Sequence, residues 1–238
     1  MVWLIIATMC AFFVKGLCGF ANTLVFTTIL GFTRDNINIS PVELILGYPS
    51  NIILAWKERK SLDWKIFLPL SMLVVAGSIP GMLLLKNADA RLAKAGFGIA
   101  VIAIGFEMLF REHFSKKTKS SKWILMAIGV ASGILCGLYG VGALLAAYVN
   151  RVTDNSKAFK ANICIVFCIE NTMRIILYTT LGILNLDILW QALLLIPFML
   201  AGLFGGMRSS AVLNEEVVKK IVIVMLILSG GALVVNNL

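Results

Sequence analysis

A lysine and two glycines interrupt the first long apolar stretch of this sequence. The interruption begins with Lys15, and Gly16, Gly19 and Asn22 follow within the next two helical turns. A glycine inside a helix costs about 1 kcal/mol relative to alanine, and a lysine in an apolar segment is costly unless water or an anion accompanies it. If the helix breaks here, its free backbone N–H groups and the Lys15 ammonium can bind an anion together. The alternative is that Lys15 only fills space between helices.

A second break of the same kind lies half a chain later, between Gly137 and Gly142. Gly137 follows Gly16 at an offset of 121 residues. Paired breaks in the two halves of a membrane protein are typical of a binding site between repeats. Gly140 lies inside the second break and would free backbone N–H groups there. Tyr139 either donates its hydroxyl group to a substrate or holds the break in place by packing.

The remaining polar groups deep in apolar segments are Asn51, Asn171, Glu170 and Arg174. The two asparagines occupy matching positions in the two halves, and they either bind a substrate or join helices by hydrogen bonds worth about 0.6 kcal/mol each. Arg174 either faces the site, snorkels to a headgroup, or pairs with Glu170 one turn earlier. Glu170 is the candidate for coupling to an ion. The candidate binding residues are Lys15, Gly16, Gly19, Asn22, Asn51, Tyr139, Gly140, Gly142, Asn171 and Arg174.

The composition places these residues in a polytopic membrane protein, because 60% of the residues are hydrophobic and the mean hydropathy is +0.95. The net charge of +9 comes from lysines and arginines in short connectors, where they set topology and contact lipid headgroups rather than nucleic acid.

The five cysteines lie in apolar segments and their spacing suits neither a redox motif nor a metal site. We therefore expect no metal and no cofactor. The first segment lacks a basic region and a cleavage site, so we expect it to be retained.

The apolar runs predict an all-α fold of two four-element repeats, each a broken or re-entrant helical hairpin followed by three transmembrane helices. The first repeat covers residues 1–111, the linker 112–122, and the second repeat 123–238. Ala76-Gly77 matches Ala201-Gly202 at an offset of 125, which supports a duplication. Within the first repeat, one helix is predicted to begin at Ser40-Pro41, which is a favoured pair for a helix start.

The charge distribution predicts how the two repeats are oriented. If both broken elements are re-entrant hairpins, the repeats are inverted, and 15 basic residues lie on one side of the membrane against 4 on the other. That asymmetry satisfies the positive-inside rule, with the linker in the cytoplasm and both termini outside. If both broken elements cross the membrane instead, the chain has eight parallel-repeat spans and the counts become 9 and 10. This alternative corresponds to a protein inserted in both orientations.

The two breaks, Gly16-Leu17-Cys18-Gly19-Phe20-Ala21 and Gly137-Leu138-Tyr139-Gly140-Val141-Gly142, each open a four-element repeat. In this the chain resembles the sulfite exporter TauE/SafE family of bacterial and archaeal membrane transporters. The resemblance covers nearly the whole chain. It implies transport of small sulfur-containing anions, such as sulfite or organosulfonates, across the cytoplasmic membrane, usually outward.

We therefore expect a secondary transporter of small oxyanions in the cell membrane, and not an enzyme. The sequence has no phosphate-binding loop of the Walker type, no paired aspartates within apolar segments and no CxxC motif. The alternatives are a thiosulfate-type importer that uses Cys18 and a membrane scaffold that does not transport. The expected partners are a small anionic substrate and the lipid bilayer, and the sequence leaves a homo-oligomer open.

Overall fold

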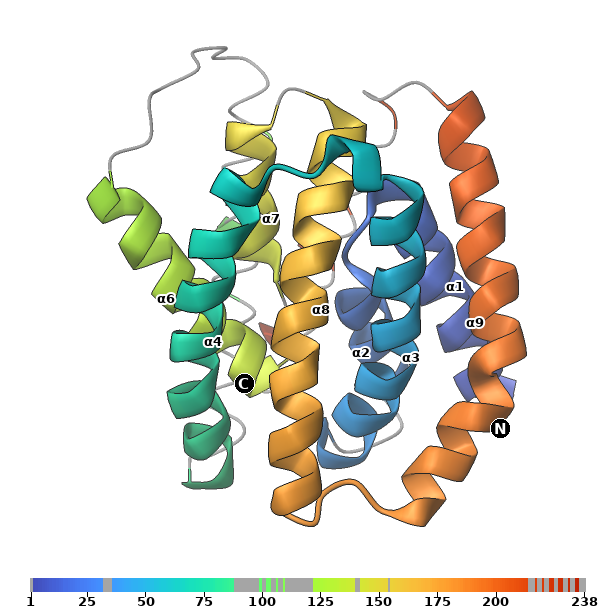
Figure 1. Ribbon diagram of the computed structural model, residues 1–238. Coiled ribbons are helices and arrows are strands. Elements are labelled where there is room, and N and C mark those ends of the chain that lie inside the picture. The colour runs from blue at the N-terminus through green and yellow to red at the C-terminus, as the bar shows by residue number, and fades with distance from the viewer. Residues whose placement is uncertain are drawn as a thin grey trace.

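The computed structural model describes residues 2–31, 36–87, 122–139, 142–153 and 155–213, with single or paired helical positions between 99 and 109 and between 217 and 235. All regular structure in these residues is helical, as the sequence predicts (Figure 1). The helices are α1 (Val2–Cys18), α2 (Asn22–Gly31), α3 (Asn36–Lys57), η1 (Arg59–Ser61), α4 (Trp64–Asn87), α6 (Lys122–Tyr139), α7 (Ala143–Val152), α8 (Ser156–Thr180) and α9 (Leu186–Val212).

The first helix breaks where the sequence predicts. α1 ends at Cys18, and Gly19 has a left-handed backbone with a φ of +89°. Ala21 also has a positive φ, of 70°, which is costly for a residue with a Cβ and is typically kept where the backbone serves a site. The chain then reverses, and α2 runs back along α1 (Figure 1). α6 and α7 form a second pair of this kind, connected through Gly142.

α3 begins earlier than predicted. Its first residue is Asn36, so the prediction that Ser40-Pro41 caps the helix is wrong. The Ser40 hydroxyl group is instead engaged by Arg174 of α8, whose Nη2 donates to Ser40 Oγ at 2.8 Å. Glu43 consequently lies two turns inside α3, and not at its exposed end.

α1 packs against α9 through glycines. A Cβ at Gly16 would lie only 2.7 Å from the backbone nitrogen of Met207. On α9, Gly202 contacts the backbone of Met9, and Gly206 contacts that of Phe13. Small residues four apart let helix backbones approach this closely in membranes. The first hairpin is therefore held by a helix from the other half of the chain.

α4 and α6 repeat this contact. Gly77 lies against the backbone of Val130, and Gly81 lies against that of Ile134. The positions on α4 precede Gly202 and Gly206 by 125 residues, and those on α6 follow Met9 and Phe13 by 121. The first helix of each hairpin thus packs on the third predicted element of the opposite half: α1 on α9, and α6 on α4. The two contacts use residues at equivalent positions of the two halves.

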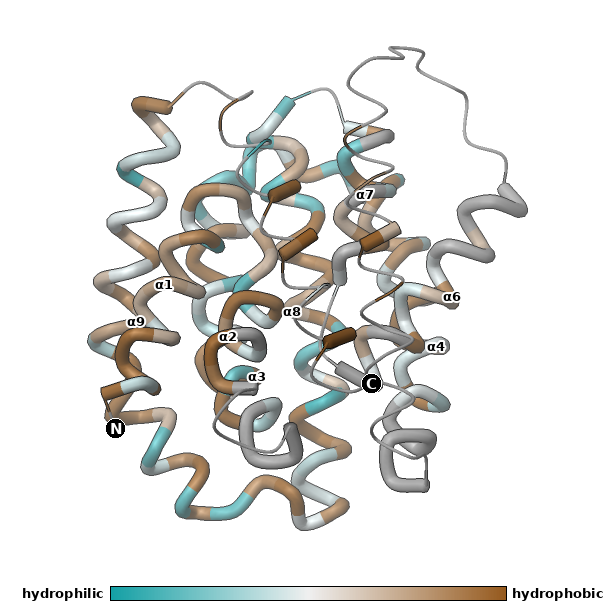
Figure 2. The backbone as a smooth tube through the Cα atoms, turned by 180° about the vertical axis from the view of Figure 1, so that it is seen from behind, coloured by the Kyte–Doolittle hydropathy of each residue, from teal (hydrophilic) through white to brown (hydrophobic). Residues whose placement is uncertain are grey.

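The outer surface of the helices is apolar. Large hydrophobic side chains are exposed along them, among them Met72 of α4, Ile176 of α8 and Leu193 of α9. Figure 2 shows hydrophobic residues along α2 and in the lower part of α9. By length and composition, three stretches of the described helices can cross a membrane: Trp64–Gly81 in α4, Ser156–Thr180 (α8) and Leu186–Val212 (α9). The chain is a membrane protein on this ground as well as by composition.

Candidate functional site

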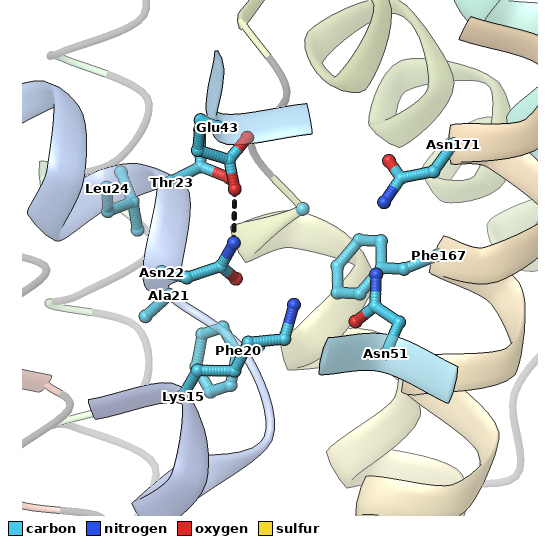
Figure 3. A pocket seen from close by; sticks show the side chains of 11 residues that line it. Lys15, Phe20, Ala21, Asn22, Thr23, Leu24, Glu43, Asn51, Phe167 and Asn171 are labelled. Atoms are coloured by element: carbon cyan, nitrogen blue, oxygen red, sulfur yellow. Dashed lines mark hydrogen bonds between the residues drawn. The ribbon is translucent and has the colours of Figure 1, made fainter. Parts of the chain in front are cut away.

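A pocket lies where the two breaks meet (Figure 3). Its empty volume, open solvent included, is about 370 Å³. The first break, α3, the second break and α8 all contribute to its wall, which brings together residues more than 100 positions apart. The lining residues are Lys15, Phe20, Ala21, Asn22, Thr23, Leu24, Glu43, Asn51, Gly142, Phe167 and Asn171.

Lys15 supplies a buried cation to this pocket. Its side chain is 1% exposed, and the ammonium group points into the pocket in Figure 3. Among the described residues, no carboxylate lies within ion-pair distance of Lys15 Nζ, and no side chain hydrogen-bonds to it. The ring of Phe12 has its centroid 5.9 Å from Nζ, which is near the limit of a cation–π contact. The ammonium thus has no ion-pair or hydrogen-bond partner among the described side chains, and it is placed for a ligand.

Two helix N-termini face the same pocket. The first α-helical hydrogen bond of α2 runs from Val25 N to Ala21 O, so the N–H groups of the preceding turn, which lines the pocket, have no acceptor within the helix. α7 begins beside Gly142, and no side chain caps it there. Each N-terminus carries a partial positive charge of roughly half a unit. Both helices therefore add to the positive potential around Lys15.

Three asparagine amides complete the polar wall. Asn22 comes from α2, Asn51 from α3 and Asn171 from α8. Asn51 is 1% exposed, and its Oδ1 atom has no hydrogen-bond partner in the described part of the chain. A buried polar atom without a partner costs about 1–3 kcal/mol, which a bound water or ligand can recover. The predicted pair Asn51 and Asn171 thus faces one cavity from both halves.

Glu43 also lines the pocket, and sequence reasoning missed it. It is 3% exposed and accepts a hydrogen bond at Oε1 from Asn22 Nδ2. The Thr23 side chain lies beside the same carboxyl group (Figure 3). The available signal was an acidic residue within an apolar run. With a helix start predicted at Ser40, Glu43 would lie in the first turn of the helix. It was therefore not counted among the polar residues deep in apolar segments.

The absence of a side chain at Gly47 keeps room beside Glu43. A Cβ added there would lie 3.2 Å from Glu43 Oε1, 3.5 Å from Asn22 Nδ2 and 3.8 Å from Asn171 Nδ2. Polar atoms from three helices therefore converge on one glycine of α3.

The tip of the first hairpin is fixed on the first turns of α8. Phe20 packs edge-on against Phe159, with ring centroids 5.8 Å apart. The aliphatic part of Lys160 covers Gly19, where a Cβ would lie 2.8 Å from Lys160 Cγ, and Lys160 Nζ donates to Ser210 at 2.7 Å. These contacts hold the break, and with it Lys15, against the other half.

Cys18 lies at the same break but not in the pocket wall. Its buried thiol is 3.0 Å from the carbonyl oxygen of Val14 and 3.1 Å from that of Phe20. The thiol therefore lies within donating distance of carbonyl oxygens on both sides of the break.

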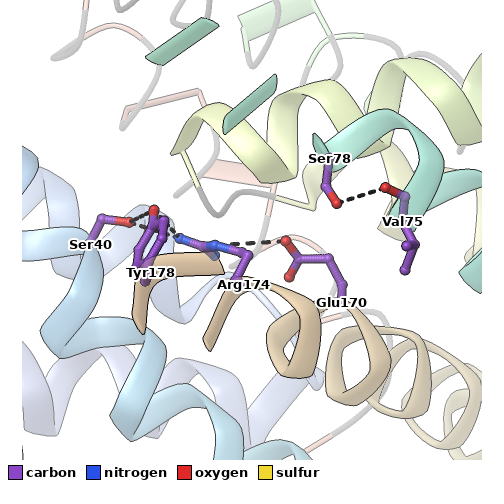
Figure 4. A network of polar contacts seen from close by, with 6 residues as sticks. All are labelled: Ser40, Val75, Ser78, Glu170, Arg174 and Tyr178. Atoms are coloured by element: carbon purple, nitrogen blue, oxygen red, sulfur yellow. Dashed lines mark hydrogen bonds and ion pairs between the residues drawn. The ribbon is translucent and has the colours of Figure 1, made fainter. Parts of the chain in front are cut away.

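Arg174 belongs to a separate buried network (Figure 4). Its Nη2 donates to Ser40 at 2.8 Å and to Tyr178 at 3.2 Å, and its Nε lies 3.7 Å from Glu170 Oε1. Pairing with Glu170 is one of the three roles that the sequence left open for Arg174. Neither residue lines the pocket.

The structure thus groups five of the predicted binding residues: Lys15, Asn22, Asn51, Gly142 and Asn171. Gly16 and Gly19 instead allow close packing, and Arg174 lies in the network above. Gly140 and the side chain of Tyr139 lie outside the described residues.

Comparison with known proteins gives one match. A family model described as "Sulfite exporter TauE/SafE" matches residues 4–233, nearly the whole chain. No curated protein and no solved structure was found to match.

Proposed function

Since this chain belongs to the sulfite exporter TauE/SafE family, we propose that it is a secondary transporter that carries a small sulfur-containing oxyanion, such as sulfite or an organosulfonate, outward across the cytoplasmic membrane. Membership in this family implies membrane transport of sulfur anions. The direction and the choice of anion are part of the proposal.

The observation that carries the proposal is the Lys15 ammonium, buried in a pocket without an anionic partner within ion-pair distance among the described residues. Two helix N-termini and three amides surround it, and these groups donate hydrogen bonds to an oxyanion. In this proposal the anion binds Lys15 directly, and Asn51 and Asn171 orient its oxygen atoms.

Alternating access in the proposal rests on two inverted repeats. The crosswise contacts of α1 with α9 and of α4 with α6 support it, because they join equivalent glycines. The chain directions in Figure 1 also support it, since α3 runs upward and its counterpart α8 runs downward. Transporters of this design move one repeat or bundle against the other around a fixed central site.

Transport by the purified protein tests this function. Proteoliposomes should accumulate labelled sulfite or a small alkanesulfonate in a saturable manner, and unlabelled substrate should compete. Thiosulfate in the same assay examines the importer alternative. Uptake equal to that of empty liposomes for all three anions would contradict the proposal.

The proposed topology predicts a specific labelling pattern. A cysteine introduced at the C-terminus should react with an impermeant thiol reagent on intact cells, and one in the linker 112–122 should not. The exposed Cys10 is replaced first, so that it gives no background. Labelling at both positions would indicate dual insertion, and labelling at neither would place the termini inside, so either result contradicts the proposed orientation.

A further inference from the structure

The anion pocket contains a carboxylate that a simple anion site does not explain. Glu43 lines the same cavity as Lys15, and Asn22, at the start of α2, donates to it. No cation among the described residues lies within ion-pair distance of this carboxylate. Glu43 and Lys15 thus line the same cavity without forming an ion pair with each other. A ligand that binds in the cavity therefore lies near both charged groups.

The charges around Glu43 come from two helices. Lys15 acts on it from α1, and Arg174 and Glu170 act on it from α8. α2 presents the neutral side chains Asn22 and Thr23. α9, which also packs on α3, carries its charged side chains, Asp187 and Arg208, exposed near its ends. Since Glu170 and Arg174 already form a pair, Lys15 is the cation left among the described residues to balance Glu43 before an anion binds.

The charge balance changes when an anion binds. Before an anion binds, the charges of the ionised Lys15 and Glu43 sum to zero. A bound monoanion would leave one uncompensated negative charge in a site with little water, which is strongly unfavourable. A proton on Glu43 restores neutrality, so protonation of Glu43 and binding of the anion favour each other. By linkage, this coupling is the same whichever binds first.

We propose that Glu43 is the proton site of this transporter, and that about one proton crosses the membrane with each monovalent anion. The proposal rests on the anion-transport function proposed above. The proton comes from water on the side where the pocket is open, is held on a carboxyl oxygen of Glu43 next to Asn22, and returns to water on the other side. Glu170 is the weaker candidate because it is paired with Arg174 outside the pocket.

Such coupling makes transport electroneutral. The membrane potential then exerts no net force on the loaded pocket, and the direction follows the combined gradients of anion and protons. Outward movement against an inward proton gradient requires the anion to be more concentrated inside, as it would be if a reaction in the cell releases it.

The first test measures proton uptake on anion binding by the intact wild-type protein in weakly buffered detergent solution. Methanesulfonate is the main probe, because it stays ionised across the pH range and any proton must bind the protein. Sulfite is the second, after correction for its own titration. We expect about one proton per bound anion. Binding without proton uptake would overturn the proposal while leaving anion transport intact, whereas no binding of either anion would overturn the transport function itself.

The second test compares two conservative variants. Glu43→Gln keeps an acceptor for Asn22 but cannot exchange a proton, and Glu170→Gln is the matched control outside the pocket. In proteoliposomes, wild-type uptake should follow an imposed pH gradient and fall roughly tenfold per pH unit on the alkaline side of its optimum. Glu170→Gln should keep this dependence, and Glu43→Gln should lose it and take up no proton on binding.

Two results would overturn the assignment. One is unchanged proton uptake in a folded Glu43→Gln protein, and the other is loss of proton uptake in Glu170→Gln alone. If Glu43→Gln does not fold, Glu43→Asp is used in its place. This variant should still take up a proton on anion binding, and the pH optimum of its transport should differ from that of the wild type. An optimum identical to that of the wild type would then count against Glu43.

Discussion

Lys15→Met is expected to abolish anion binding and transport while the protein still folds. Methionine keeps most of the apolar stem of the side chain and removes the one cation among the described residues that line the pocket. Removing one partner from a buried charge pair costs about 2–5 kcal/mol, which corresponds to roughly a 30-fold to several-thousand-fold loss of affinity. Calorimetry with methanesulfonate on the purified variant measures the loss, and size-exclusion elution verifies the fold.

A second buried lysine provides the matched control. Lys160→Met removes a cation that bonds Ser210 outside the pocket and keeps the aliphatic packing on Gly19, so binding should stay within a few-fold of the wild type. Lys15→Arg should retain part of the binding, because the charge remains but the larger planar group fits the cavity less well. Full binding by a folded Lys15→Met protein would contradict the anion site.

Gly206→Ala is expected to destabilise the protein severely. The new Cβ would lie 2.9 Å from the backbone carbon of Phe13 and 3.0 Å from the Cα of Gly16. Because both neighbours are backbone atoms, no rotamer change relieves the contact, and α1 and α9 must separate. Overpacking of this kind costs about 1–3 kcal/mol or more. The measurement is thermal unfolding in detergent, together with the amount of monodisperse protein.

Adjacent and equivalent glycines make this prediction specific. At Gly205 a Cβ would meet only the ring of Phe13, at 3.5 Å, so Gly205→Ala should leave stability nearly unchanged. Gly81→Ala should resemble Gly206→Ala, because it introduces the same contact between α4 and α6. Equal effects at Gly205 and Gly206 would show that the close approach of α1 and α9 does not limit stability.

The sequence predicts the breaks because their signals are local. Glycines next to a lysine interrupt an apolar run, and Gly16 and Gly137 reveal the repeat by their spacing alone. The asparagine pair could be found in the same way, since Asn51 and Asn171 occupy matching positions. Both asparagines line one pocket in the structure.

Other roles could not be predicted because they depend on distant partners. Gly16 looks like part of a break, but its contact is the backbone of α9, which the sequence does not indicate. Arg174 looks equally suited to an anion and to Glu170, and only the fold directs it toward Ser40. Glu43 was missed because Pro41 was taken as a first-turn residue, whereas α3 begins at Asn36 and tolerates this proline within the helix.

The packing of α1 on α9 has a consequence for the synthesis of the chain. Gly16 leaves the ribosome 190 residues before Gly206, its neighbour in the folded protein. At about 5–20 residues per second, α1 must wait roughly ten to forty seconds in the translocon or the lipid before its partner is made. During that time the α9 backbone that packs on Gly16 is not yet made, and the pocket that surrounds Lys15 is incomplete. The second hairpin does not wait in this way, because α4 is already in place when α6 emerges. The N-terminal hairpin is therefore the element that an insertion chaperone would have to hold.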